Sequence, residues 1–198
     1  EISCEVISKD SEGRPTKARS EAIKIVGNDE LCEYATADSL TIGTGTVSDP
    51  YVICNKAHFN LIRNNMSVHY ELRSDIDLIS GNDVTNALGT GFIPIGLDIT
   101  TPNEATSFTG SLVGNGFTIK NSTSDLKAKY NAIFAKVESA SFSNIKFENI
   151  NNTGTVDTVV TETNTGILAA HSIGTSYTDI TVESSDVKGT YAGFIATA

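Results

Sequence analysis

Short apolar clusters alternate with small polar residues along most of the chain. Beyond residue 80 the clusters are three to six residues long and end at Gly, Asn, Thr or Ser. They are rich in β-branched and aromatic residues, which favour strands, and they lack the long apolar period of a helix. The pattern therefore predicts an all-β chain of many short strands. The stretches that contain these clusters read GFIPIG, FTGSLVGNGFTIKN, AIFAKV, SFSNIKFENI, GILAAHSI, YTDITVESSDVKG and YAGFIATA.

Two of these phrases recur along the chain. AIFA at 132–135 is echoed by GILA at 166–169 and GFIA at 193–196, and SNIKFEN at 143–149 is echoed by TDITVES at 178–184. Self-similarity with a period of about 20 to 50 residues is typical of arrays whose units bury their apolar faces by stacking. Because the units consist of strands, the sequence predicts a parallel β-helix, a solenoid of stacked coils. The residues expected to point inward are Phe142, Ile145, Phe147, Ile167, Ile180 and Val182.

One stretch, NKAHFNLIRN at 55–64, has helical spacing instead. Asn55 stands at the N-cap position, and Phe59 and Ile62 lie three residues apart on one face. We expect a short helix that caps one end of the β-helix. His58 lies on this helix, and we interpret it as a residue of the surface or its boundary rather than a ligand.

Residues 1–42 differ from the rest. EISCEVIS and AIKIVG read as two strands on either side of a polar loop at 9–20. We interpret residues 1–42 as a small strand-rich cap or the end of a preceding domain, and residues 43–198 as the β-helix. The last phrase restarts the core pattern, so we expect the array to continue, or to be capped, beyond residue 198. An open last coil exposes strand edges, so a homo-oligomer that builds a fibre is another possibility.

The charge of the chain argues against two classes of partner. Its net charge is −10, and its 14 basic residues are scattered rather than clustered. Nucleic-acid phosphates require clustered Lys and Arg, so we expect no nucleic-acid partner. A membrane helix needs about 20 consecutive apolar residues, and the chain has no such run, so we expect no membrane insertion.

The three cysteines, Cys4, Cys32 and Cys54, fit no zinc spacing. One interpretation is that all three are buried apolar residues. The other is a disulfide between Cys4 and Cys32, which requires an oxidising compartment and leaves Cys54 as a buried free thiol. We favour the disulfide, because Cys54 follows the apolar run Tyr51-Val52-Ile53.

Three stretches together resemble the amino-terminal signature of bacterial surface proteins with GLUG-type repeats, a family akin to filamentous-haemagglutinin-like adhesins. They are GTGTVSDPYVICNKAHFNLIRNNMSVHYELRSDIDL at 43–78, PIG at 94–96 and FTGSLVGNGFTI at 108–119. The repeat's Gly-Leu-Phe-Gly phrase appears here with alanine, in AIFAKV and GILAAH. The resemblance implies a right-handed β-helix, an extracellular location at the bacterial cell surface, and adhesion to a glycan or protein of another cell. It implies no catalytic residue and no cofactor.

The alternative function is a β-helical polysaccharide lyase or glycoside hydrolase. Such enzymes need paired carboxylates, or a base with calcium, on one exposed face. Asp75 and Asp77 are the best pair, two residues apart on one strand, and Asn82 and Asp83 follow them. The spacing lacks the glycine and distal Glu of a calcium loop, so we predict no metal site. We interpret the Asp75–Asp77 pair as a turn or a solvated strand edge and predict no catalytic residue.

Binding residues are expected in the loops that interrupt the strand rhythm, at 80–92 and 96–106. A carbohydrate ligand would also need aromatic rings to stack on. The chain has no Trp, which leaves tyrosines for this role. The candidate ligand-binding residues are Asn82, Asp83, Asn86, Asn103, Glu104, Tyr130 and Tyr177.

Overall fold

The computed structural model describes residues 5–9, 15–19, 31–32, 39–79 and 88–195. The chain divides into two units, Glu1–Tyr34 and Ala35–Ala198. In the first unit, β1 (Glu5–Lys9) and β2 (Pro15–Arg19) form an antiparallel hairpin. β2 falls within the stretch expected to be a loop, so that expectation is wrong. Its five residues pair with the whole of β1.

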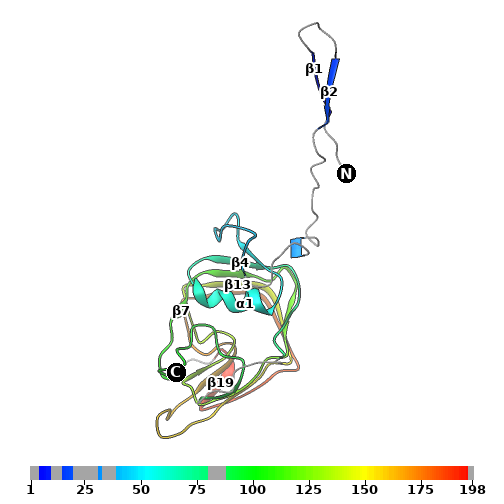
Figure 1. The fold of residues 1–198 in the computed structure, drawn as a ribbon. Helices are drawn as coiled ribbons and strands as arrows, with labels where there is room; N and C mark the ends of the chain where they lie inside the picture. Colours follow the sequence, from blue (N-terminus) through cyan, green and yellow to red (C-terminus); the bar gives the residue numbers. More distant parts are fainter. Residues whose placement is uncertain (1–4, 10–14, 20–30, 33–38, 80–87, 196–198) are drawn as a thin grey trace. The chain divides into compact units, whose positions relative to one another are not determined.

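The described residues of the second unit form short strands and one short helical segment (Figure 1). The helical segment contains α1 (Lys56–Leu61) and the 3-10 helix η2 (Ile62–Asn64). The strands are β3 (Tyr51–Ile53), β4 (His69–Leu72), β5 (Ile76–Asp77), β6 (Gly89–Gly91), β7 (Ser107–Phe108), β8 (Ser111–Val113), β9 (Thr118–Lys120), β10 (Thr123–Leu126), β11 (Tyr130–Asn131), β12 (Lys136–Glu138), β13 (Ser141–Glu148), β14 (Asn151–Gly154), β15 (Asn164–Ala169), β16 (Ser172–Ile173), β17 (Ser176–Glu183), β18 (Asp186–Lys188) and β19 (Tyr191–Ile195).

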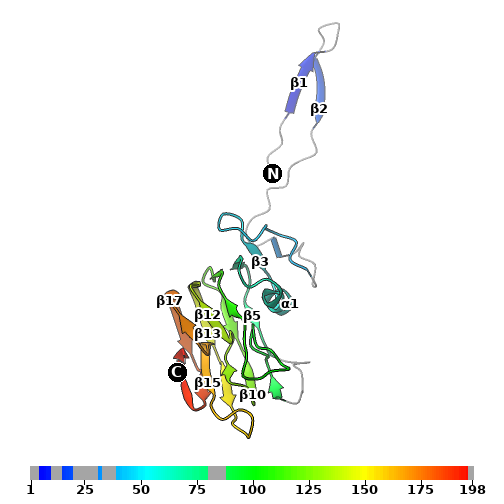
Figure 2. The same cartoon turned by 90° about the vertical axis from the view of Figure 1, so that its left-hand side faces the viewer.

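The strands of this unit assemble into four sheets. The largest contains β3, β4, β8, β13, β9 and β5, with β17 paired to β13. The others contain β6-β10-β14-β18, β11-β15-β19 and β7-β12-β16. Between the named strands of the second unit, pairing is parallel except between β6 and β10. Figure 2 shows β13 and β17 side by side, and β9 separates β13 from β5 in the sheet. The all-β prediction is confirmed.

The phrases that recur in the sequence are neighbours in these sheets. Phe147 pairs with Val182, so SNIKFEN at 143–149 lies beside TDITVES at 178–184. AIFA at 132–135 lies beside GILA at 166–169, because Ile133 and Phe134 donate backbone hydrogen bonds to the carbonyls at 167 and 168. The phrases that recur in the sequence therefore lie in neighbouring layers and pair in parallel.

The core is a column of large side chains that runs through the largest sheet. Strand register aligns Tyr51, Tyr70, Leu112, Phe142 and Tyr177, one from each strand. Parallel strands lie about 4.8 Å apart, so aligned side chains on one face touch. The rings of Phe142 and Tyr177 stack with centroids 5.8 Å apart.

The predicted inward residues follow this core, with one exception. Phe142, Ile145, Phe147 and Ile167 are buried, and Ile180 is half-buried. Val182 is the exception, because it registers with the buried Phe147 on β13 and yet is 37% exposed. It lies on β17, whose only partner among the described strands is β13, and nothing described covers its far side.

The predicted helix is confirmed at 56–64. The side chain of Asn55 caps it by accepting a hydrogen bond from the backbone N–H of His58, at 2.9 Å. Phe59 and Ile62 are fully buried. The expectation for His58 is wrong, because the residue is 1% exposed and its Nδ1 accepts a hydrogen bond from the backbone N–H of Cys54.

Left-handed residues recur at matching places in neighbouring strands. Asn144 and Asp179, which register between β13 and β17, both have φ of 52°. Asn and Asp tolerate this conformation better than other residues with a Cβ. At another corner the side chain of Asn149 donates to Asn121 Oδ1 at 2.8 Å, and Asn121 in turn donates to Asp77 Oδ1 at 3.0 Å. At this corner, amide side chains are thus hydrogen-bonded from one layer to the next.

Part of the interior is polar. Ser124 Oγ lies 2.8 Å from Oδ1 of both Asn131 and Asn152, and all three residues are buried. Asn152 also donates to the Gly166 carbonyl at 3.0 Å. Buried polar groups are tolerated when they are hydrogen-bonded in this way. The sequence pattern does not predict this network.

One connection is longer than its counterparts in the neighbouring layers. Nine residues, 155–163, separate β14 from β15. Three residues separate β10 from β11, and two separate β18 from β19, which are the matching connections on either side. The long connection therefore adds residues without changing the register of the strands around it.

Cys32 and Cys54 are both disulfide-bonded. The expectation that Cys54 is a free thiol is therefore wrong. The predicted Cys4–Cys32 bridge is wrong with it, because in a chain of three cysteines that bridge would leave Cys54 unbonded. Cys4 itself lies outside the described residues.

We predict that non-reducing peptide mapping of protein from an oxidising compartment will find Cys54 in a cross-linked peptide. Alkylation without reduction should leave that cysteine unlabelled. Recovery of a labelled Cys54 peptide in high yield would contradict the prediction.

We predict that Phe134→Ala lowers the free energy of unfolding by about 3 to 5 kcal/mol, as measured by urea denaturation. Phe134 is fully buried, and its ring lies 5.0 Å from that of Phe108 and 5.2 Å from that of Phe142. Phe194→Ala is the matched control, since Phe194 is only half-buried on β19. Equal losses from both variants would contradict the layered core.

Candidate functional site: a tyrosine-lined pocket

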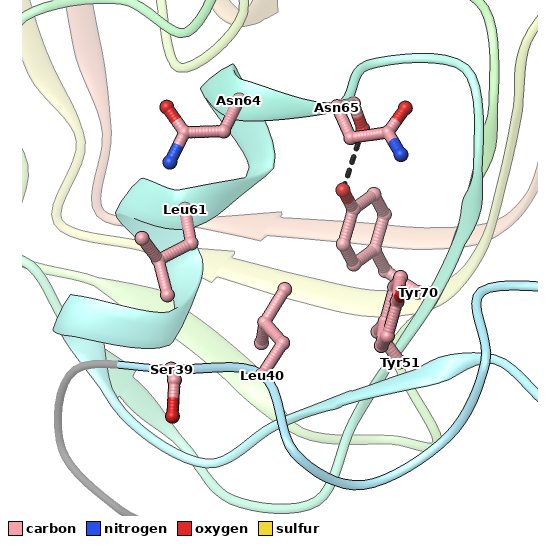
Figure 3. Close-up of a pocket in the computed structure, with 7 residues that line it drawn as sticks. All are labelled: Ser39, Leu40, Tyr51, Leu61, Asn64, Asn65 and Tyr70. Atoms are coloured by element: carbon pink, nitrogen blue, oxygen red, sulfur yellow. Dashed lines mark hydrogen bonds between the residues drawn. The ribbon is translucent and has the colours of Figure 1, made fainter.

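A pocket of about 290 Å³ opens beside the helical segment (Figure 3). Residues 39–40, the strands β3 and β4, and the segment 61–65 contribute to it. Two tyrosines, two leucines, two asparagines and a serine surround the space. The lining residues are Ser39, Leu40, Tyr51, Leu61, Asn64, Asn65 and Tyr70.

A turn that contains Gly43 and Gly45 supports the ring of Tyr51 at the pocket wall. A Cβ on Gly45 would lie 2.5 Å from the Tyr51 ring, so only glycine allows the ring to pack there. Gly43 and Gly45 both have positive φ, which glycine adopts without strain. The turn is closed by the backbone N–H of Thr44, which donates to the Asp49 carbonyl at 3.0 Å. The run GTGT in the sequence is therefore a support for the pocket wall.

Tyr70 forms the buried wall. Its hydroxyl donates a hydrogen bond of 2.5 Å to the Asn65 carbonyl, which ties β4 to the end of the helical segment. Its ring centroid lies 6.0 Å from that of Tyr51. Burial of the phenol, and secondarily the nearby Tyr51, raises the pKa of Tyr70 to about 12. Tyr70 is therefore a neutral hydrogen-bond donor at physiological pH.

The rim of the pocket is polar. Asn64 and Asn65 are exposed, and Asn65 Oδ1 accepts a hydrogen bond from Ser67 Oγ at 3.2 Å. Amide groups offer both donors and acceptors. Aromatic and leucine walls with a few amides suit an uncharged, hydroxyl-rich group such as a sugar ring. Among the described residues, the lining holds no carboxylate, histidine or cysteine that could act as an acid, a base or a nucleophile.

Sequence reasoning missed this pocket. The sequence pattern places Tyr51 in an apolar run, and the phrases DPY and HY give no sign that the rings of Tyr51 and Tyr70 meet. Their spacing of 19 residues becomes one register position only when β3 pairs with β4. The paired glycines before DPY were the available signal.

The predicted loop candidates are not among the pocket residues. Asn82, Asp83 and Asn86 lie outside the described residues. Asn103 and Glu104 are exposed in the described loop at 96–106. The amide of Asn103 donates to the Val159 carbonyl at 3.2 Å, so this side chain anchors one loop to another.

The two tyrosine candidates are not exposed platforms. Tyr177 is half-buried in the core column, and its hydroxyl lies 2.7 Å from Ser172 Oγ. Burial raises the pKa of Tyr177. Tyr130 is 7% exposed, and Lys136 Nζ lies over its ring, 4.7 Å from the centroid. Neither ring presents a free face in the way that a sugar-stacking platform requires.

Asp75 and Asp77 each hold a neighbouring strand. Asp75 accepts hydrogen bonds from the backbone N–H of Thr118 at 2.9 Å and from Lys120 Nζ at 3.4 Å. Asp77 Oδ1 accepts from the amide of Asn121 and from the backbone N–H of Ile79, and these hydrogen bonds lower its pKa. Both carboxylates therefore link β5 and its flank to β9.

The described residues contain neither a metal-binding cluster nor a membrane-spanning helix. No group of three or more His, Cys, Asp or Glu in this part of the chain could hold a metal ion. Among the helices of the described residues, none is long and apolar enough to cross a membrane.

Comparison with known proteins gave one partial match. Over 82 residues the chain is 38% identical to Halomucin of Haloquadratum walsbyi (strain DSM 16790 / HBSQ001). The match covers 40% of this chain and 1% of Halomucin. No protein-family model matches the chain, and no solved structure matches it significantly. The resemblance to proteins with GLUG-type repeats therefore stays a prediction.

We predict that Tyr70→Phe changes how stability depends on pH. A phenol whose folded pKa of about 12 exceeds its ordinary value of 10 stabilises the fold fully below pH 10. That contribution is lost as the pH rises through 12. The variant should be about 1 kcal/mol less stable at pH 7, from the lost hydrogen bond, and the difference should shrink between pH 10 and 12.

Urea denaturation at a series of pH values measures this difference. Tyr191→Phe, which removes a hydroxyl from the last strand, is the matched control. A Tyr70→Phe difference that stays constant from pH 7 to 12 would contradict the buried phenol.

Proposed function

We propose that this chain is a non-enzymatic recognition module of an extracellular surface or fibre protein, and that its strands form the coils of a right-handed parallel β-helix. Parallel pairing supports the architecture: residues of β12, β13 and β14 pair with residues 35 positions further on, in β16, β17 and β18. In a β-helix each coil stacks on the next, so paired strands are separated by the length of one coil. The handedness rests on the resemblance to the GLUG-type family.

The tyrosine-lined pocket is the observation that carries the recognition function. It combines the half-buried ring of Tyr51, two leucines and two exposed amides, with the buried Tyr70 behind them, and it is built on paired strands rather than on a loose loop. Binding sites usually combine apolar walls with a few well-placed polar groups. We propose that the pocket binds a sugar unit of a glycan on another cell.

The enzyme alternative, a polysaccharide lyase or glycoside hydrolase, has less support. Its best carboxylates, Asp75 and Asp77, already accept hydrogen bonds from β9 and Asn121. In a glycosidase, the general acid and the nucleophile or base are both carboxyl groups that face the substrate. The two groups here serve instead to hold strands together.

We predict that filling the pocket abolishes binding. Asn64→Trp places a large side chain at the rim, and binding on a glycan array and to whole cells should fall at least about tenfold, equivalent to about 1.4 kcal/mol. Thr161→Trp adds the same side chain to the exposed connection at 155–163 and is the matched control. Loss of signal in both variants would point to non-specific effects of tryptophan and contradict the pocket assignment.

A turnover assay separates recognition from catalysis. Acidic and neutral polysaccharides, with and without calcium, should remain uncut by the wild-type chain. Cleavage that disappears in Asp75→Asn or Asp77→Asn, with the melting temperature preserved, would overturn the proposed function in favour of the enzyme.

A further inference from the structure

Three basic side chains gather around the ring of Tyr130. Lys136 Nζ lies 4.7 Å from the ring centroid and Lys129 Nζ lies 5.7 Å from it. The His171 ring meets the Tyr130 ring edge-on, with centroids 6.3 Å apart. We call Lys129, Tyr130, Lys136 and His171 the Tyr130 cluster. None of its basic groups adjoins the other two in sequence, so the fold brings them together.

Strand register explains how they meet. Val137 pairs with Ser172, which places Lys136 and His171 next to each other in neighbouring layers. Lys129 directly precedes β11, and its backbone N–H donates to the Pro102 carbonyl at 2.8 Å. Beneath them, Tyr130 packs in a small apolar core. That core contains Leu97, Leu126, Ala128, Ala132, Ala135 and Ala170.

The positive charge of the Tyr130 cluster is not neutralised within the described part of the chain. No carboxylate there lies within 4.0 Å of Lys129 or Lys136. Lys120 and Lys146 of the same unit are paired, with Asp75 at 3.4 Å and with Glu183 at 2.8 Å. In a chain of net charge −10, two unpaired lysines over one ring form a local concentration of positive charge.

The buried tyrosine holds the lysines without cancelling their charge. The face of an aromatic ring attracts an ammonium group and leaves its other N–H donors free. Both ammonium groups contact the same ring, so acidic groups carried on one polymer can engage both. Glu138 is outward on the same strand as Lys136 and limits how far a long polyanion can extend along it.

We infer that the Tyr130 cluster binds the carboxylate or sulfate group of an acidic polysaccharide. Three basic groups match isolated acidic groups spaced along a sugar chain. The surrounding negative charge disfavours the continuous phosphate backbone of a nucleic acid. Anion binding follows from the cluster alone, and the choice of polysaccharide as the polymer rests on the proposed recognition function.

The experiment measures binding of the full chain to four probes by isothermal titration calorimetry. The probes are heparin for sulfate, polygalacturonate for carboxylate, dextran as the neutral control and single-stranded DNA. Lys129→Gln/Lys136→Gln should raise the Kd for the preferred acidic polysaccharide about tenfold and lower the slope of log K against log salt by about two, one for each lost contact. Lys120→Gln/Lys188→Gln removes the same charge from paired lysines and is the matched control.

The outcomes separate the two proposals. Loss of binding in the first double variant with retention in the control supports the site, and the preferred probe identifies sulfate or carboxylate. Equal loss in both double variants, no binding of wild type to either acidic polysaccharide, or tighter binding of DNA overturns it. If cell binding fails altogether but the first double variant loses polysaccharide binding selectively, the anion site stands and the proposed recognition of cells falls.

Retained melting temperatures show that the variants are folded. Tyr130→Leu provides a second line of evidence, because it keeps an apolar side chain in the small core and removes the ring that holds the lysines. It should weaken binding of the preferred acidic polysaccharide. Unchanged binding in this variant would contradict the role given to Tyr130.

Discussion

In-register stacking of large inward side chains is the constraint on which the rest of this structure depends. Tyr51, Tyr70, Leu112, Phe142 and Tyr177 occupy one register position in successive strands. A slip of one residue in any strand would turn its inward set outward. The tyrosine-lined pocket and the Tyr130 cluster both exist because register aligns residues that are tens of positions apart in sequence.

The sequence predicts those parts of the fold that depend on local pattern. The helix over 55–64 and the recurring strands around 143–149 and 178–184 were predictable because capping and apolar period act over a few residues. The burial of His58 and the exposure of Val182 were not predicted, since burial depends on which neighbouring segment covers a residue. The pocket could not be predicted, because its two tyrosines meet only through pairing of β3 with β4.

Polar groups in this chain have two distinct uses. On the outside, Asp75, Asp77, Asn121 and Asn149 link strands of neighbouring layers, so that acidic and amide side chains contribute to cohesion. Lys146 also joins its own strand to the next through Glu148 and Glu183, and these contacts raise its pKa. Groups with such partners are poor candidates for ligand contacts. Polar side chains that lack them, such as Asn64 at the pocket rim, are the better candidates.

The nine-residue connection at 155–163 has a consequence for how such a chain can change its length. The strands on either side keep the same parallel partners as in the layers with two- or three-residue connections. Residues can therefore be added at this corner at the modest entropic cost of a longer loop, which grows only with the logarithm of its length. This corner is a natural acceptor for an inserted peptide tag or a small folded domain.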